Sequence, residues 1–332
     1  MPSAASLAMN VRLYREQVRK ALTYVRAWDS YWQETLQMEK TGGRGDLLGA
    51  YPLDFRPRLR EGHYPTSDFE GVPMWPHPVD GRPRYFTTAM TSCALALWHH
   101  FVVDGDSGSL HRMLRIARRL LAGCWEGSEL HLLDDGREPL LSAMSQGEAM
   151  SVLCRAWQAT GEEEYRVGAL ACLGPFRRSV EDRGVIGRFS ASGSVWFEEL
   201  TTKPLHHILN GMVYAIWGLQ DLASATGNLE AFELSEMGVQ AIETEIGRFD
   251  LGWWSSYWVP EPGGVCYPAS AMYHSLHICQ LRALGWVHGR TKILAAADRF
   301  RSYASRPLNR LRAAYTLLKG KRQLRAHRAG AK

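Results

Sequence analysis

Hydrophobic residues recur at helical spacing along most of the chain, and a glycine turn follows four of these stretches. The turn signals are Asp104-Gly105, Thr160-Gly161, Thr226-Gly227 and His288-Gly289, and each stands between two helix-patterned stretches. Glycine after a helix favours a left-handed C-cap, and a short loop makes the two helices antiparallel neighbours. The pattern therefore predicts four helical hairpins that repeat about every 60 residues.

Stacked hairpins of this kind predict an all-α fold, an (α/α) barrel or toroid of inner and outer helices. Strand signals are confined to short pieces of the connections, such as Gly184 to Phe189 and Ser194 to Phe197. Short β-hairpins are therefore expected between the helices. The segments that enter the inner helices should crowd at one mouth of the barrel, which is where we look for chemistry.

The pattern divides the chain into three parts. Residues 1–45 hold an amphipathic helix, roughly Ala5 to Gln37, whose apolar side could pack on the barrel or on a second subunit, so a homodimer is one expectation. Residues 46–306 form the barrel domain. Within it, the segment Tyr51 to Tyr85 is rich in proline, glycine and aromatic residues and predicts an ordered loop over a cleft. Residues 307–332 comprise a last helix, Leu308 to Leu318, and a basic tail.

Charge is distributed unevenly along the chain. The 39 Lys and Arg exceed the 34 Asp and Glu, but 14 of the basic residues and only one acid lie between Arg282 and Lys332. The preceding 281 residues therefore carry eight more acidic than basic side chains. The tail suits weak peripheral attraction to an anionic membrane surface. It has no interleaved aromatic residues or recognition motif, so a nucleic-acid partner is not expected.

Several functional classes are disfavoured by what the sequence lacks. No apolar run approaches the roughly 18 residues of a membrane span, and the first residues lack the order of a signal peptide, so a cytoplasmic protein is expected. Neither a Walker loop nor a strand-flanked GxGxxG is present, and no cofactor is expected. The six cysteines form no CxxC pair and predict free, buried thiols. His274 and His277 lack a third ligand at metal-site spacing, so no metal is expected.

Polar and aromatic residues gather before the third and fourth hairpins. The first group holds Glu198, Glu199, His206, His207 and Asn210, and the second holds Tyr257, Tyr273, His274 and His277. Paired acids, tyrosines and histidines at one mouth suit proton transfer on a polar, ring-shaped substrate. The same residues could instead be core aromatics, solvated carboxylates and structural histidines, and the pattern alone leaves both interpretations open.

In these segments the sequence resembles the C-terminal catalytic domain of the D-glucuronyl C5-epimerases, which act on heparosan and heparan sulfate chains. The motifs occur in the family's order between about Ser142 and Leu284, and more weakly back to Tyr51. They are Ser142–Ala149 (SAMSQGEA), Trp196–Glu199 (WFEE), Ile208–Tyr214 (ILNGMVY), Gly218–Leu222 (GLQDL) and Tyr273–Leu281 (YHSLHICQL). The resemblance implies an (α/α) barrel and a substrate that is a uronic-acid-containing polysaccharide or a lipid-linked glycan.

The resemblance also implies how the residues act. Glu199 and Tyr273 would be the two acid/base groups that invert C5 of a uronate, with Tyr257 supporting them. A tyrosine has a free pKa near 10, so His274 or Arg188 would have to lower the pKa of Tyr273. Further substrate contacts are expected by position from Arg84, Arg188, Trp196, Glu198, Asn210 and His274.

Two departures from the family pattern leave other functions open. Leu200-Thr201 stands where the family has tyrosine and proline, and Pro260 stands where it has an arginine. The substrate could therefore be a different uronate polymer, whose carboxylates would meet local cations such as Arg84, Arg188 or Lys203. The alternatives are a uronate polysaccharide lyase, which shares the first proton abstraction, and a non-catalytic glycan-binding protein.

Overall fold

The computed structural model describes residues 33–34, 48–60, 62–77, 80–135, 139–261, 264 and 266–316. Within them, four helical hairpins occur where the sequence predicted them. The pairs are α2 (Thr87–Asp104) with α3 (Ser107–Leu121), α4 (Ala143–Thr160) with α5 (Glu163–Ala171), α6 (Leu209–Thr226) with α7 (Leu229–Glu245), and α8 (Ala271–Val287) with α9 (Thr291–Ser305). The glycine of each turn has a positive φ, which confirms the predicted turns; these are Gly105 (72°), Gly161 (72°), Gly227 (70°) and Gly289 (61°).

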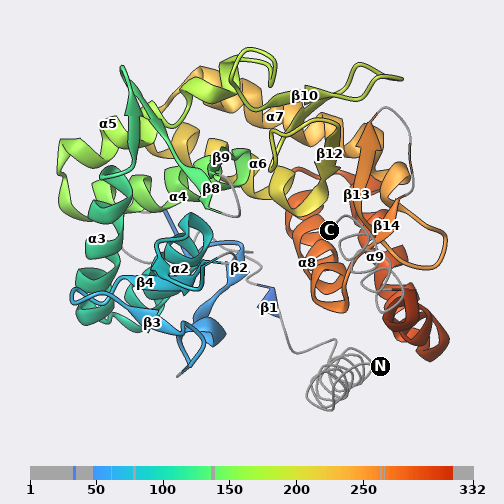
Figure 1. Ribbon diagram of the computed structural model, residues 1–332, viewed down its shortest axis with the longest axis horizontal. Coiled ribbons are helices and arrows are strands. Elements are labelled where there is room, and N and C mark those ends of the chain that lie inside the picture. Colours follow the sequence, from blue (N-terminus) through green and yellow to red (C-terminus); the bar gives the residue numbers. More distant parts are fainter. Residues whose placement is uncertain are drawn as a thin grey trace, which may run out of the picture.

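The hairpins follow one another around an arc, with α2, α4, α6 and α8 on its inner side (Figure 1). Helix α4 packs between α2 and α6, and α6 also contacts α8. The inner helices are buried on almost every face because they carry apolar and small residues all round, whereas α3 buries one stripe and exposes Arg112, Arg115 and Arg118. This arrangement confirms the predicted all-α toroid of helical hairpins.

A short strand near the start of the chain joins the first and last parts of the arc. Strand β1 (Gln33–Glu34) pairs with β2 (Leu53–Asp54) and contacts α8 (Figure 1). The predicted helix Ala5 to Gln37 is wrong at these two residues, because their backbone pairs with β2. The rest of that helix lies outside the described residues, as does the tail from residue 317; residues 307–316 are helical.

The connections between hairpins carry the predicted short strands. Strands β10 and β11 confirm the two strand signals named from sequence, while the segment Tyr51 to Tyr85 contains paired strands and a 3-10 turn where a loop was expected. Pro73, Pro76 and Pro83 stand at strand ends, so the backbone between them still pairs. The remaining elements are η1 (Arg56–Leu59), β3 (Thr66–Ser67), β4 (Pro73–Pro76), β5 (Pro83–Arg84), β6 (Cys124–Glu126), β7 (Glu129–His131), β8 (Leu133–Asp135), β9 (Pro139–Leu141), η2 (Gly174–Arg177), β10 (Ile186–Arg188), β11 (Val195–Phe197), β12 (Leu205–Ile208), η3 (Ile246–Phe249), β13 (Ser256–Glu261) and β14 (Tyr267–Pro268).

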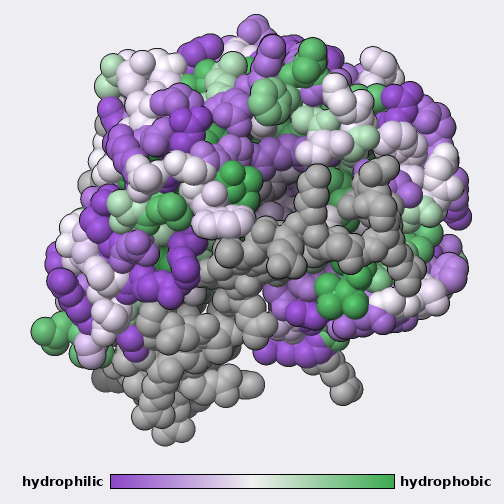
Figure 2. All heavy atoms as spheres, turned by 180° about the vertical axis from the view of Figure 1, so that it is seen from behind, coloured by the Kyte–Doolittle hydropathy of each residue, from purple (hydrophilic) through white to green (hydrophobic). Residues whose placement is uncertain are grey.

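No helix in the described part of the chain is long and apolar enough to cross a membrane. All six cysteines are free; Cys93, Cys154, Cys172 and Cys279 are buried, whereas Cys124 is exposed and Cys266 half-buried. On the face shown in Figure 2, hydrophobic side chains are scattered among hydrophilic ones.

Helices α4 and α6 approach each other through two glycines. A Cβ on Gly147 would lie 2.6 Å from the Cα of Ala215, and a Cβ on Gly218 would overlap the backbone of Gly147. The buried guanidinium of Arg155 on α4 then bonds Asp221 on α6, with Nη1 and Oδ2 2.5 Å apart. The contact therefore depends on glycine at both positions, because backbone cannot move aside as a flexible side chain can.

We predict that Gly218→Ala destabilises the protein by about 3 kcal/mol, since its methyl group would separate α4 from α6. The free energy of unfolding in urea measures the effect. Gly247→Ala is the matched control, because the space around Gly247 is open, and it should change stability by less than about 0.5 kcal/mol. Equal stability of both variants would contradict the inferred close contact.

Candidate active site

The carboxylate of Glu199 lies against the first turn of α6. Glu199 follows β11 and is 7% exposed. The side-chain amide of Asn210 donates to its Oε2 at 3.1 Å. A Cβ on the next residue, Gly211, would lie 2.5 Å from the same oxygen, so glycine leaves the room that the carboxylate occupies. The start of α6 therefore holds Glu199 in one position.

Tyr273 stands in the first turn of α8. The Ser270 hydroxyl caps this helix and accepts from the Tyr273 backbone N–H at 3.3 Å. The ring of Tyr257, on β13, lies 4.6 Å from the ring of Tyr273 at an angle of 53°. Both tyrosines are half-buried. The helix cap and the neighbouring ring thus fix the direction of the Tyr273 side chain.

Tyr214, on α6, is a buried tyrosine whose pKa is affected by both Glu199 and Tyr273. Burial raises its pKa far above the ordinary value, and the charges of Glu148, Tyr273 and Glu199 raise that pKa further, while Arg58 opposes them. Charge interactions weaken with distance, so these groups surround one phenol. Glu148, on α4, accepts a hydrogen bond from the Thr91 hydroxyl at 2.9 Å. The charges of Glu148 on α4, of Tyr273 on α8 and of Glu199 therefore all act on one phenol of α6.

Glu198 points into the protein interior, away from Glu199. Its Oε1 lies 2.6 Å from Nδ1 of His207, and neither side chain has exposed surface. Burial raises the pKa of Glu198, and the hydrogen bond to His207 opposes that shift. Trp196 is also fully buried and stacks on Phe249. The structure therefore places these two predicted substrate contacts in the core beneath the site.

His274 and His277 are buried and share Ser255. The backbone N–H of Ser255 donates to Nδ1 of His274 at 3.1 Å, and the opposite nitrogen, Nε2, lies 2.9 Å from the Phe300 carbonyl, to which it donates. The Ser255 hydroxyl lies 3.0 Å from Nδ1 of His277. Burial lowers the pKa of both histidines to about 3. His274 is therefore neutral at pH 7 and cannot lower the pKa of Tyr273 by its charge.

The cations named from sequence lie on the surface. Arg84 pairs with Asp80 at 2.7 Å, and Arg188 donates from Nη1 to the Gly193 carbonyl at 3.1 Å. Lys203 pairs with Glu181, and both side chains are more than half exposed. Of the residues predicted to meet at one site, the structure shows a contact between Glu199 and Asn210 and another between Tyr257 and Tyr273.

A pocket of about 320 Å³ lies at the start of α8, and none of its lining residues was predicted as a catalytic or substrate-binding residue. It extends from η1 and the following strands to the start of α8, where Met272 precedes Tyr273. Its lining comprises Arg58, His63, Tyr64, Trp75, Phe86, Thr88, Ala89, Ser92 and Met272. The aromatic and basic composition of the segment after Tyr51 was the available signal, but nothing in the sequence placed that segment beside α8.

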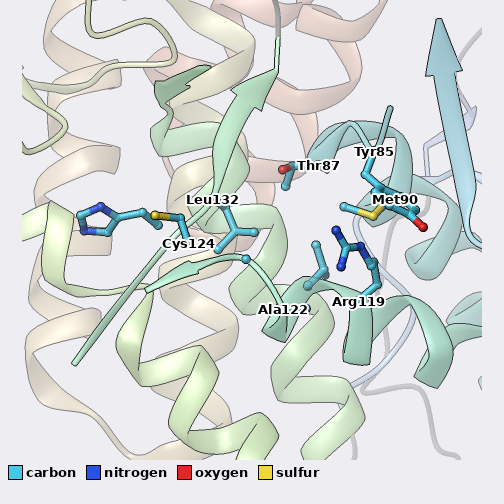
Figure 3. Close-up of a pocket in the computed structure, with 10 residues that line it drawn as sticks. Tyr85, Thr87, Met90, Arg119, Ala122, Cys124 and Leu132 are labelled. Atoms are coloured by element: carbon cyan, nitrogen blue, oxygen red, sulfur yellow. The ribbon is translucent and has the colours of Figure 1, made fainter. Parts of the chain in front are cut away.

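A second pocket, of about 380 Å³, lies against the opposite face of the first turn of α2 (Figure 3). The guanidinium of Arg119 stacks over the ring of Tyr85 at 4.2 Å, and the Tyr85 hydroxyl donates to Asp68 at 2.8 Å. Nε of Arg119 is buried and has no hydrogen-bond partner among the described residues. The second pocket is therefore lined by the positively charged Arg119 guanidinium, whose position is set by the Tyr85 ring.

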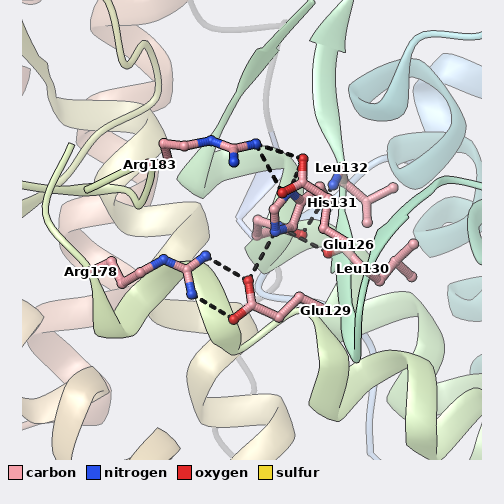
Figure 4. Close-up of polar contacts among 8 residues, drawn as sticks. Glu126, Glu129, Leu130, His131, Leu132, Arg178 and Arg183 are labelled. Carbon is pink, nitrogen blue, oxygen red and sulfur yellow. Dashed lines mark hydrogen bonds and ion pairs between the residues drawn. The ribbon is translucent and has the colours of Figure 1, made fainter. Parts of the chain in front are cut away.

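Ion pairs fix the hairpin β6–β7, which forms one wall of the second pocket (Figure 4). Arg178 bonds both oxygens of Glu129 at 2.6 Å, and Arg183 bonds Glu126 at 2.9 Å. The Arg178 hydrogen bonds lower the pKa of Glu129 to about 2, and His131 at 3.0 Å adds to this effect. Glu126 and Glu129 thus form ion pairs with arginines of the neighbouring segment, whereas Arg119 lines the second pocket.

The depressed histidine pKa values predict acid sensitivity. An unfolded histidine takes up a proton below about pH 6.5, whereas His274 and His277 stay neutral in the folded protein until about pH 3. Their contribution to stability is complete above pH 6.5 and is lost as the pH falls. The free energy of unfolding should drop by up to about 1.4 kcal/mol per pH unit for each histidine between pH 6.5 and 5.

His277→Asn keeps a polar atom toward Ser255 and should remove about half of this pH dependence in urea unfolding experiments. His111→Asn, on the exposed surface of α3, is the control and should leave the slope as it is in the wild type. A slope unchanged by His277→Asn would show that this histidine titrates alike in the folded and unfolded states.

Comparison with known proteins identifies the part of the chain that carries this site. The family model described as "D-glucuronyl C5-epimerase C-terminus" matches residues 129–302. The D-glucuronyl C5-epimerase of Caenorhabditis elegans is 30% identical over 177 residues, which make up 49% of this chain and 28% of that protein. An uncharacterized protein of Methanocaldococcus jannaschii is 28% identical over 151 residues, 45% of this chain and 46% of its own length. The chain thus spans less than half of each relative.

Among solved structures, the cellobiose 2-epimerase of Bacillus thermoamylovorans has a similar fold, with a TM-score of 0.52 and 11% sequence identity. The similarity covers 89% of this chain and 87% of that one. Identity this low supports the α/α toroid fold alone. The family match includes Glu199, Asn210, Tyr257 and Tyr273, and it covers more than half of the chain. The chain belongs to the D-glucuronyl C5-epimerase family, within which it matches the C-terminal domain.

Proposed function

We propose that this protein is an epimerase that inverts C5 of D-glucuronyl residues, giving L-iduronyl residues, within a polysaccharide or a lipid-linked glycan. The observation that carries the proposal is that Asn210 contacts Glu199 and Tyr257 contacts Tyr273, while the charges of Glu199 and Tyr273 both act on the Tyr214 phenol. Membership of the family supports the same reaction. The family name alone points to the uronate C5 specificity, so this remains part of the proposal.

The reaction requires an acid and a base on opposite faces of the sugar ring. The carboxyl group next to C5 acidifies the C5 hydrogen, and one side chain removes it to leave an enediolate. The other side chain supplies a proton from the opposite face, which inverts the carbon. We assign these two roles to Glu199 and Tyr273. Asn210 positions the Glu199 carboxylate, and Tyr257 positions the Tyr273 ring.

Two basic pockets support a polymeric substrate. Arg58 lines the pocket beside Met272, and Arg119 lines the pocket on the opposite face of the α2 start. A uronate polymer carries a carboxylate on each uronate, so it could engage both cations at once, whereas a single sugar could not. We therefore place the reacting residue at the first pocket and a neighbouring part of the chain at the second.

Solvent exchange tests the reaction directly. The wild-type protein, incubated in deuterated water with unsulfated glucuronate polymers, should incorporate deuterium at C5, because the returned proton comes from a group that exchanges with solvent. Glu199→Gln and Tyr273→Phe should each lower incorporation by at least about a hundredfold, since each removes one proton-transfer group. Tyr303→Phe, on the outer helix α9, is the matched control and should retain activity.

Two other results would contradict epimerisation. Growth of the enoate absorbance of an unsaturated uronate would indicate a lyase, in which loss of the C5 proton is followed by expulsion of the C4 substituent. Tight polymer binding without exchange, unaffected by Tyr273→Phe, would indicate a glycan-binding protein.

The second pocket predicts a dependence on chain length. Arg119→Met should raise the KM for the polymer about tenfold and leave the KM for a short oligosaccharide within about twofold, because only the longer chain reaches Arg119. Arg118→Met removes the same charge at the exposed adjacent position and is the control. An equal loss for both chain lengths would place Arg119 at the reacting residue instead.

A further inference from the structure

The proposed reaction places a demand on the site that the residues predicted from sequence do not meet. Removing the C5 proton transfers negative charge onto a carboxylate that is already anionic, so a nearby cation would stabilise the product of that step. Arg84 and Arg188 make their contacts at the surface, and Lys203 pairs with Glu181. The neutral His274 supplies no charge.

Arg58 lies in a suitable position to meet this demand. Its guanidinium carbon is 4.8 Å from the centre of the Phe55 ring, and that ring stacks on Tyr214 at 6.5 Å and 22°. Tyr214 is the phenol on which the charges of Glu199 and Tyr273 both act. The Phe55 ring therefore contacts both the Arg58 guanidinium and the Tyr214 ring.

The segment that carries Arg58 is held rigidly. Asp54 accepts from Nε and Nη2 of Arg56 at 3.0 and 2.9 Å, and its Oδ1 also accepts from the Arg56 backbone N–H. Phe55 and Tyr51 are fully buried and stack on one another. The Arg58 guanidinium stacks on the buried Phe55 ring, and a side chain that is held before the ligand arrives lowers the entropic cost of binding.

The pocket beside Arg58 has the lining of a site for a sugar. Trp75 is 40% exposed, and His63 lies edge-on to it with ring centres 6.4 Å apart. Indole faces pack against the C–H faces of sugar rings, while an arginine fork bonds both oxygens of a carboxylate. The volume of about 320 Å³ is within the range of small-ligand pockets.

We propose that Arg58 binds the carboxylate of the uronate whose C5 reacts, and that this sugar packs on Trp75 in the pocket between η1 and Met272. The inference rests on the proposed function for the identity of the sugar. It assigns carboxylate recognition to the segment before the first hairpin, across the mouth from the helix that carries Tyr273.

Two ligands that differ only in their carboxyl groups test whether Arg58 recognises the carboxylate. One is an unsulfated tetrasaccharide that contains glucuronate, and the other is the same tetrasaccharide with its carboxyl groups reduced to alcohols. Calorimetric titration should give the wild type at least a tenfold lower Kd for the first ligand. Arg58→Met should reduce this preference to within about twofold, and Arg58→Lys should keep an intermediate preference because it retains charge without the planar fork.

Arg60→Met is the matched control, since Arg60 is an exposed arginine of the same segment. It removes one positive charge and should preserve the tenfold preference. The inference is overturned if the wild type binds both tetrasaccharides equally, or if Arg58→Met and Arg58→Lys both retain the wild-type preference. Thermal unfolding of each variant shows whether a lost preference comes from a folded protein.

Deuterium exchange distinguishes a failure of the binding inference from a failure of the proposed function. If the wild type prefers the carboxylate through Arg58 but incorporates no deuterium at C5, the binding inference stands and the epimerase proposal fails. If the wild type exchanges the C5 hydrogen while Arg58→Met binds and exchanges equally well, the epimerase proposal stands and Arg58 has no part in recognition.

Discussion

The close approach of α4 and α6 is the constraint on which the site depends. Gly147 and Gly218 let the two backbones touch, and the same spacing brings the starts of both helices together, where the Asn210 amide lies 3.7 Å from the Met144 sulfur. Gly211 then leaves space for the Glu199 carboxylate. The position of the Glu199 carboxylate therefore depends on glycine at these three positions.

The polar residues beneath the mouth have a structural role that supports the site. The Glu198–His207 pair ties β11 to β12, and Ser255 ties the segment before β13 to two histidines of α8. The hydrogen bonds between these groups offset part of the cost of burying them, and they fix the segments that carry Glu199 and Tyr257. His274 acts here as a neutral connector between Ser255 and Phe300 and not as a proton donor to the substrate.

The sequence predicted the helical framework well because its signals are local. Each hairpin depends on a glycine that adopts a positive φ and on apolar residues at helical spacing, and both can be recognised without knowledge of the fold. The motif-bearing segments also indicated Glu199, Asn210, Tyr257 and Tyr273 as candidates, and the structure shows contacts between Glu199 and Asn210 and between Tyr257 and Tyr273. Their roles remain predictions.

Side-chain direction and contacts between distant segments were decided by the tertiary structure. Adjacent residues of an extended segment point to opposite sides, so only the fold shows that Glu199 meets α6 while Glu198 is buried with His207. Arg58 and Met272 are more than 200 positions apart, yet they line one pocket because the arc of hairpins brings the first and last segments together. The sequence by itself determined the helices, their turns and the set of candidate residues; the packing of the helices determined which of those residues lie in contact and which are buried in the core.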